Sequence, residues 1–170
     1  MLTFVPQKGQ PQNTLLRIHA TSTDVFDRVL LIEDSEDAML LVHAALEGYG
    51  GGRYMLEWAD TLTDGLKRLS KGGVDVVLLD LGLPESTGAA SYTSAHEIAG
   101  EVPIVVLTGD TTERTEISVS ARGVDHYLLK QRITGSLLLK TIRQALYGTK
   151  RRERESRAQT FRWARDTSLS

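Results

Sequence analysis

The sequence predicts an α/β fold in which helices cover both faces of one five-stranded parallel sheet. Short aliphatic runs alternate with longer helix-patterned segments along most of the chain, and this alternation is typical of parallel sheets. The central runs are apolar at nearly every position, which indicates strands buried on both faces. The predicted strands lie at residues 29–32, 53–60, 75–80, 102–108 and 125–130.

Helical spacing and capping residues place the helices between these strands. Ser35 can cap a helix over residues 35–50, whose first turn carries two acids and for which Gly48 is a plausible end. The next predicted helix ends in glycine. The helices after the first are predicted at residues 61–73, 91–100, 111–123 and 133–154, and the pattern over 91–100 is short and weak.

Composition narrows the class of protein. The chain has 170 residues and a formal net charge of -2, which fits a soluble globular protein and argues against a general nucleic-acid binder. It contains no cysteine, so disulfides and thiolate metal sites are excluded, and a cytoplasmic location is expected. Every apolar run is shorter than the ~20 residues that cross a membrane.

We expect three parts in the chain. Residues 1–27 are a polar N-terminal extension, residues 28–148 form one domain, and residues 149–170 form a charged helical extension or linker. The last segment is basic and carries two aromatic residues, so a contact with a partner or a second copy of the chain remains an alternative. Nucleic-acid binding is the least favoured of these readings, because acidic residues are mixed in and the segment is too short for a helix-turn-helix domain.

Polar residues stand at the ends of the predicted strands. In a doubly wound sheet of flavodoxin-like order 2-1-3-4-5, ligands bind beyond the carboxyl ends of the strands, where the strand order reverses. Glu33 and Asp34 follow the first strand, Asp80 ends the third, Thr108 ends the fourth and Lys130 ends the fifth. The sequence therefore predicts that carboxylates, a hydroxyl and an ammonium group meet in one crevice.

This set of groups suits a phosphoryl group better than a metal ion alone. Clustered carboxylates repel one another, and a hard cation such as Mg²⁺, which prefers oxygen ligands, removes that repulsion. A metal needs no cation opposite it, whereas phosphoryl oxygens can be neutralised by Lys130, by Thr108 and by backbone N–H groups. One carboxylate can then act as nucleophile, and Asp80, central and alone on its strand, is the best candidate.

Four separated segments resemble the signatures of a known family. They read "LLIEDS", "VVLLDLGLPESTG", "IVVLTGD" and "HYLLK", and in order and spacing they are similar to the response-regulator receiver domain of two-component systems, over roughly residues 28–148. The resemblance implies a phosphoprotein that takes its phosphoryl group from a histidine kinase or a histidine phosphotransfer protein. It would signal through the surface around the fourth helix, fifth strand and fifth helix. It would promote its own phosphorylation and dephosphorylation without being an enzyme that turns over a metabolite.

The resemblance also assigns roles to single residues. Asp80 matches the phosphoacceptor, Thr108 the switch hydroxyl and Lys130 the lysine that pairs with the phosphate. Tyr127 matches the aromatic residue that changes rotamer when the threonine moves. Asp110 matches a position that influences hydrolysis, so Asp110→Ala should change the rate of autodephosphorylation, and an unchanged rate would refute that role.

The implied cofactor is Mg²⁺, bound at the acidic end of the site. Asp34 and Asp80 match its direct carboxylate ligands, and Gly82 matches the residue whose main-chain carbonyl contacts the metal. Glu33 is expected to reach the ion through water. The glycines and the proline after Asp80 predict a tight turn that lets the backbone approach the phosphoryl group and the metal closely.

Gln131 departs from the family pattern, which usually has proline directly after the lysine. The departure leaves the shape of the following loop open. It also leaves open a receiver-like module that signals by protein contact without phosphorylation. The chain can equally be the receiver part of a larger hybrid kinase, phosphatase or cyclic-dinucleotide enzyme, and the output partner, the signal and a homodimer are not settled by the sequence.

Rival classes fit the residues less well. An aspartyl-nucleophile phosphatase would want a second acid two residues after Asp80, where Gly82 stands. A flavin-binding module would need a phosphate-cradling loop after the first strand, where "EDSEDA" would repel phosphate. The glycine-rich "EGYGGGR" lacks the Lys-Ser/Thr ending of a phosphate-binding loop and precedes a strand, so we interpret it as a flexible loop. The four histidines show no metal-ligand spacing and are interpreted as structural or surface residues.

Overall fold

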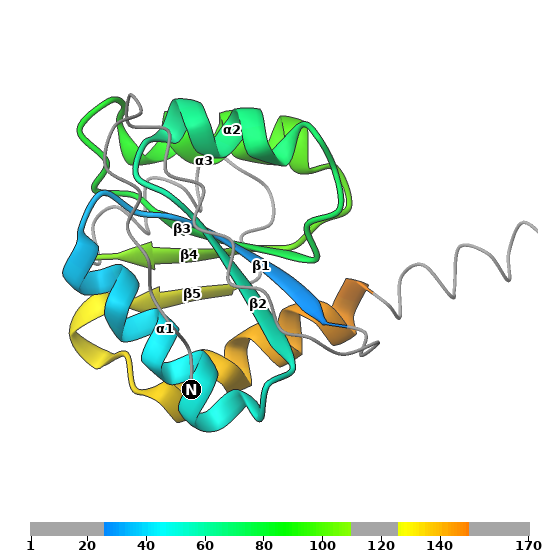
Figure 1. Cartoon of the computed structure of the whole chain (residues 1–170). Helices are drawn as coiled ribbons and strands as arrows, with labels where there is room; N and C mark the ends of the chain where they lie inside the picture. Colours follow the sequence, from blue (N-terminus) through cyan, green and yellow to red (C-terminus); the bar gives the residue numbers. More distant parts are fainter. Residues whose placement is uncertain (1–25, 110–125, 150–170) are drawn as a thin grey trace, which may run out of the picture.

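The computed structural model describes residues 26–109 and 126–149. Figure 1 shows one sheet with helices on both sides. In chain order the elements are β1 (Asp27–Ile32), α1 (Glu36–Gly50), β2 (Tyr54–Ala59), α2 (Leu62–Leu69), β3 (Val76–Asp80), α3 (Gly88–Ala99), β4 (Ile104–Thr108), β5 (His126–Leu129) and the 3₁₀ helix η1 (Lys130–Arg132). A helix over residues 135–149, orange in Figure 1 and named the C-terminal helix below, follows η1.

The five strands are parallel and lie in the order β2-β1-β3-β4-β5, which confirms the predicted fold class. All residues of β3 and β4 are buried, as their continuous apolar composition predicts. The pairing registers align the carboxyl ends of neighbouring strands. Ile32 pairs with Leu79, Asp80 with Leu107, and Thr108 with Leu129. The residues that follow these strands are therefore delivered to one edge of the sheet.

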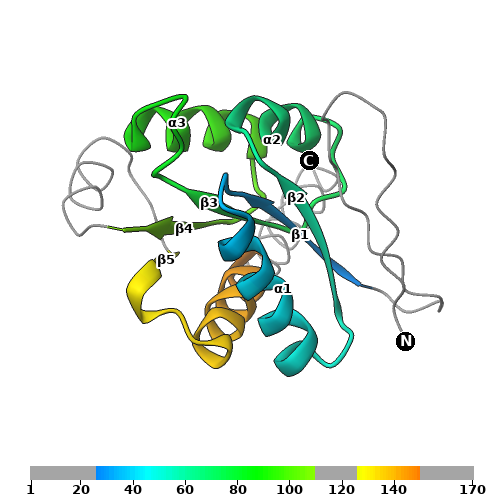
Figure 2. The same ribbon diagram turned by 60° about the vertical axis from the view of Figure 1, so that its left-hand side comes forward.

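Successive strand residues feed two separate cores, because side chains alternate across a strand. In β1, Val29 and Leu31 pack with α1 and the C-terminal helix, whereas Leu30 and Ile32 pack on the side of α2 and α3. Figures 1 and 2 both show α2 and α3 over one face of the sheet and α1 with the C-terminal helix over the other. With both faces covered, the carboxyl edge is the place where polar side chains can gather.

A buried ion pair and a close backbone approach hold α2 against the sheet. Arg68 of α2 forms a bidentate pair with Glu57 of β2, in which Nε donates to Oε2 and Nη2 donates to Oε1 at 3.0 Å. Nη1 also donates to the Gly72 carbonyl at 2.9 Å. Gly65 lets α2 approach β1, because a Cβ at that position would lie 2.5 Å from Cδ1 of the fully buried Ile32.

Three predicted helix ends were wrong. Gly48 does not end α1, which continues to Gly50 and stops at the left-handed Gly51 (φ 61°), because a glycine ends a helix only where the backbone takes that conformation. The second helix ends at Leu69, and Gly72 and Gly73, predicted as its end, lie after it. The weak helix begins earlier than predicted, at Gly88, after an extended Thr87.

Several predictions lie outside the described residues. These are the N-terminal extension up to residue 25, the helix at 111–123, Asp110, and the charged segment from residue 150 onward. β1 begins at Asp27, one residue before the predicted start of the domain, and Asp27 pairs with Arg53 at 3.1 Å. Within residues 26–109 and 126–149, the structure contains no helix of the length and hydropathy needed to span a bilayer.

Candidate functional site at the carboxyl edge of the sheet

The predicted site residues collect at the carboxyl edge. Glu33 directly follows β1, Asp80 ends β3, Thr108 ends β4 and Lys130 directly follows β5. The prediction that Lys130 ends a strand was wrong by one residue, since β5 stops at Leu129 and Lys130 opens η1. The ammonium nevertheless reaches the acids, because the aligned registers of β1, β3, β4 and β5 put these positions side by side.

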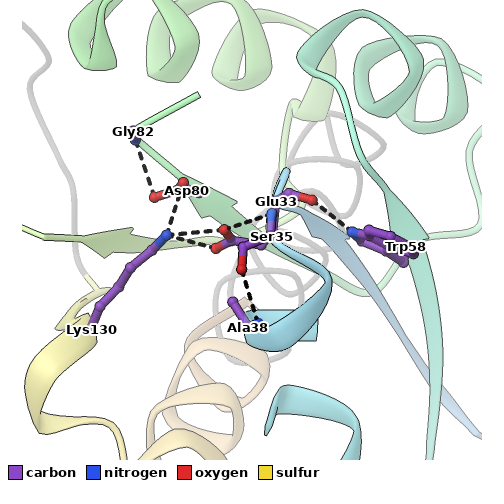
Figure 3. A network of polar contacts seen from close by, with 7 residues as sticks. All are labelled: Glu33, Ser35, Ala38, Trp58, Asp80, Gly82 and Lys130. Atoms are coloured by element: carbon purple, nitrogen blue, oxygen red, sulfur yellow. Dashed lines mark hydrogen bonds and ion pairs between the residues drawn. The ribbon is translucent and has the colours of Figure 1, made fainter. Parts of the chain in front are cut away.

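Lys130 bridges the two buried carboxylates, as Figure 3 shows. Its Nζ lies 2.9 Å from Oδ2 of Asp80, 2.8 Å from Oε2 of Glu33 and 3.1 Å from Oε1 of Glu33. The carboxylates are almost completely buried, at 1% and 3% exposure for the side chains of Glu33 and Asp80, whereas that of Lys130 is 32% exposed. One ammonium group is thus shared between two acids, with its approach open to solvent.

Burial and the neighbouring charges together raise the pKa values of both Glu33 and Lys130. Burial raises the pKa of Glu33, and the negative charge of Asp80 raises it further, while Lys130 lowers it in part. For Lys130, burial lowers the pKa, but the hydrogen bonds and charges from Glu33 and Asp80 outweigh burial, so the pKa of the lysine is raised overall. The Lys130 side chain therefore stays protonated, and its positive charge lies between the Glu33 and Asp80 carboxylates.

Asp34 adds a third carboxylate next to the buried pair. Ligand oxygens of Glu33, Asp34 and Asp80 lie within 4.8 Å of one another, and Asp34 is exposed to solvent. Oε2 of Glu33 is buried and accepts no hydrogen bond of good geometry from the described residues, although the Lys130 charge lies nearby. Three carboxylates against one ammonium leave an excess of negative charge, and this donor set fits a hard, oxygen-preferring divalent cation.

Backbone and neighbouring side chains hold the two acids in place. The Gly82 N–H donates to Oδ1 of Asp80 at 3.1 Å, so the turn after β3 orients the carboxylate (Figure 3). On the other acid, the Ser35 N–H donates to Oε1 of Glu33 at 3.3 Å, while Ser35 Oγ accepts from the Ala38 N–H and caps α1. The predicted metal contact of the Gly82 carbonyl stays a prediction.

Thr108 and Tyr127 lie on the neighbouring strands β4 and β5. Thr108 is fully buried, and its Cα partner in the sheet is Leu129, the residue before Lys130. Tyr127 is half-buried and packs against the core on the α2 and α3 side. The structure thus places Thr108 at the carboxyl end of β4, between β3 and β5, and Tyr127 two residues before the end of β5. Their roles as switch residues stay predictions.

Two further contacts at this edge were not anticipated from the sequence. The Trp58 indole N–H of β2 donates to the Glu33 carbonyl at 2.7 Å and holds the loop that carries the acids (Figure 3). The Gln131 side-chain amide donates to the Gly109 carbonyl at 2.6 Å. Strand order brings β2 next to β1 and β5 next to β4, but only the three-dimensional structure shows that these particular side chains reach these carbonyls.

Comparison with known proteins agrees with this architecture. The family model of the response regulator receiver domain matches residues 29–144. A solved structure of a response regulator receiver domain protein (CheY-like) from Methanospirillum hungatei JF-1 superposes with a TM-score of 0.65 at 25% identity, covering 75% of this chain and 98% of that one. The residues that the family model matches include all of the predicted strands and all five site positions at the carboxyl edge of the sheet.

Curated relatives carry a similar segment inside longer chains. The KDP operon transcriptional regulatory protein KdpE of Escherichia coli (strain K12) is 33% identical over 102 residues, which are 60% of this chain and 44% of KdpE. The aerobic respiration control sensor protein ArcB of the same organism is 29% identical over 146 residues, which are 76% of this chain and 18% of ArcB. The chain therefore spans less than half the length of these relatives. It belongs to the response regulator receiver domain family of two-component signalling.

Proposed function

We propose that this chain is a phosphoacceptor receiver domain in which Asp80 takes a phosphoryl group from a histidine kinase or a histidine phosphotransfer protein. The observation that carries the proposal is the Lys130 ammonium group, held 2.9 Å from Oδ2 of Asp80 and 2.8 Å from Oε2 of Glu33 at an open sheet edge. A cation in this position partly offsets the charge of the buried acids, and it can likewise offset the charge of a phosphoryl group formed on one of them.

The reaction is a transfer between a nitrogen and an oxygen. A carboxylate oxygen of Asp80 attacks the phosphorus of a phosphohistidine, and the P–N bond breaks as the O–P bond forms. The imidazole nitrogen leaves with the bonding electrons and takes a proton from solvent. The product is an acyl phosphate on Asp80, which later attack by water returns to carboxylate and inorganic phosphate. The domain would thus carry out its own phosphorylation and dephosphorylation and turn over no metabolite.

Each neighbouring residue has a part in this step. Lys130 already contacts Asp80, so its ammonium group can follow the charge onto the phosphoryl oxygens with little movement. The Gly82 N–H fixes the rotamer of the nucleophile by bonding its Oδ1. Thr108 would donate its hydroxyl to the phosphoryl group from β4, and Tyr127 would change rotamer as Thr108 moves.

The acidic cluster would hold Mg²⁺, with Asp34 and Asp80 as direct carboxylate ligands, the Gly82 carbonyl as a third ligand, and Glu33 acting through water. When bound, the ion supplies positive charge that neutralises the phosphoryl oxygens. The support for this assignment is that three carboxylates lie together with a single ammonium group among them. Lys130 supplies one positive charge to the two buried acids, and the ion would supply the rest.

The same proposal extends to partners and location. Transcriptional regulators and sensor proteins both appear among the relatives, so the chain would act through protein contacts, either alone or as part of a longer protein. The surface that would change lies around the helix predicted at 111–123, β5 and the C-terminal helix. A donor kinase and the absence of cysteine both fit the cytoplasm.

Incubation of the full chain with acetyl phosphate and Mg²⁺, followed by intact-mass measurement, tests the proposal. We expect one phosphoryl group on the wild-type chain and none on Asp80→Asn, which keeps the size of the side chain but removes its nucleophilic charge. Chelation of the metal should abolish the modification. Asp75→Asn is a matched control, because this acid bonds the Arg28 N–H at the opposite end of β3 and should leave modification unchanged. An unmodified wild-type chain, or equal modification of Asp80→Asn, would overturn the assignment.

A further inference from the structure

The Gln131 side chain joins the two loops that flank the phosphoryl position. Its Nε2 donates to the Gly109 carbonyl at 2.6 Å, and both residues are exposed. Gly109 directly follows Thr108, and Gln131 directly follows Lys130. The hydrogen bond therefore connects the two residues that adjoin the proposed hydroxyl and ammonium contacts of the phosphoryl group.

This bond lies where the regular pairing of β4 and β5 stops. The register of these strands ends with Thr108 opposite Leu129. Beyond Leu129 the chain turns into η1, which the Ile133 N–H closes on the Lys130 carbonyl at 3.3 Å. The Gln131 amide bridges the strands one step further, with a side-chain donor in place of a backbone one. A proline at position 131 would have no such donor.

We propose that Gln131 is a positioning residue, which sets the spacing between Thr108 and Lys130 so that both reach one phosphoryl group on Asp80. The inference rests on the proposed phosphoacceptor function. The bond is made to the carbonyl of Gly109, which directly follows Thr108, so it fixes the backbone next to the hydroxyl relative to the backbone next to the ammonium group. Groups that are correctly spaced before the ligand arrives lose less freedom on binding, and this raises affinity.

A positioning role separates phosphoryl binding from metal binding. The Gln131–Gly109 bond lies on the β4–β5 side of the site, whereas Asp34 follows β1 on the other side. Loss of the bond should therefore weaken the hold on the phosphoryl group and leave the hold on Mg²⁺ unchanged. A purely structural role would lower both together with the melting temperature.

The test uses the full chain with Gln131→Met, which keeps the length of the side chain and removes its donor. Affinity for beryllofluoride, an analogue of the acyl phosphate, is measured at saturating Mg²⁺, and Mg²⁺ affinity and melting temperature are measured separately. One lost hydrogen bond predicts beryllofluoride binding weaker by about 2- to 10-fold. Mg²⁺ affinity should stay at the wild-type value. Gln144→Met, on the exposed side of the C-terminal helix, is the matched control and should behave as wild type.

A second variant tests whether Gln131 acts through Thr108. In a Thr108→Val background, Gln131→Met should cause no further loss of beryllofluoride affinity, because the hydroxyl that it positions is gone. Wild-type beryllofluoride affinity in Gln131→Met, or a full additional loss in the Thr108→Val background, overturns the positioning role. Failure of the wild-type chain to bind beryllofluoride is a different result, since it overturns the proposed function and the inference with it.

Discussion

In the described part of the chain, the Glu57–Arg68 pair and the Glu33–Asp80–Lys130 cluster hold buried charges in opposite ways. On the α2 side, Arg68 and Glu57 form a closed pair in which both side chains are buried, at 5% and 2% exposure, and the guanidinium also bonds a backbone carbonyl. At the carboxyl edge, the Lys130 ammonium is shared by Glu33 and Asp80, and the lysine is 32% exposed. The first cluster matches one cation to one anion, and the second leaves acids in excess.

The difference between the two clusters shows which arrangement of charges leaves room for a ligand. The planar guanidinium of Arg68 satisfies its carboxylate with two parallel hydrogen bonds, so little capacity remains for a ligand. Lys130 is a compact charge on a flexible side chain, and it can follow whatever negative charge develops beside it. The two acids outnumber this one ammonium group, and a third, exposed carboxylate, Asp34, lies beside them. The closed pair stabilises the fold, and the open cluster can exchange partners.

The largest effect on stability should come from the closed pair. Arg68→Met leaves Glu57 buried without a cation and should lower the free energy of unfolding by about 3–5 kcal/mol. The double variant Glu57→Leu/Arg68→Met removes both charges and should recover most of that loss. Urea unfolding measures both. Arg53→Met is a control at an exposed guanidinium, where about 1 kcal/mol or less is expected. If Arg68→Met were as stable as the wild type, the buried pair of Glu57 and Arg68 would not be formed as described.

Removal of the cation from the open cluster should have a smaller effect that Mg²⁺ can offset. Lys130→Met leaves two buried carboxylates facing each other, but solvent reaches this edge, so a loss of about 1–3 kcal/mol is expected without metal. Added Mg²⁺ should raise the melting temperature of Lys130→Met more than that of wild type, because the ion takes over the missing positive charge. Mg²⁺ should raise the melting temperature of Arg68→Met only as much as it raises that of the wild type. An equal Mg²⁺ response in the two variants would contradict the proposed metal role of the cluster.

The smallest change in stability, with a clear change in metal binding, is expected at Asp34. This side chain is exposed, so Asp34→Asn should alter the free energy of unfolding by about 0.5 kcal/mol or less. Loss of one of three carboxylates should weaken Mg²⁺ binding by about tenfold or more, equivalent to about 1.4 kcal/mol. Calorimetric titration measures the affinity, with Asp37→Asn in the first turn of α1 as the control. Unchanged affinity in Asp34→Asn would remove it from the ligand set.

The sheet was predicted well from the sequence, because strands buried on both faces are apolar at nearly every position. The short, continuous apolar runs of β1, β3 and β4, separated by helical segments, indicate buried parallel strands. Helix ends were predicted less well, since glycine permits a left-handed conformation without requiring it, and Gly48 and Gly51 look alike in a sequence. The Glu57–Arg68 pair was not predicted, because an acid in an alternating strand reads as a solvent-facing residue.

The sequence by itself determined the fold class and the residues that follow each strand, because these depend on periodicity and on the position of each residue after its strand. The strand order was predicted from the resemblance of the motifs to a flavodoxin-like family. Only the tertiary structure decided which of those groups touch. Lys130 is 97 residues from Glu33 along the chain, and its choice of two acids depends on the register of four strands. The same holds for Trp58 on the Glu33 carbonyl and Gln131 on the Gly109 carbonyl. Hydrogen bonds depend on distances of a few tenths of an ångström, and residue spacing along the chain carries no information on that scale.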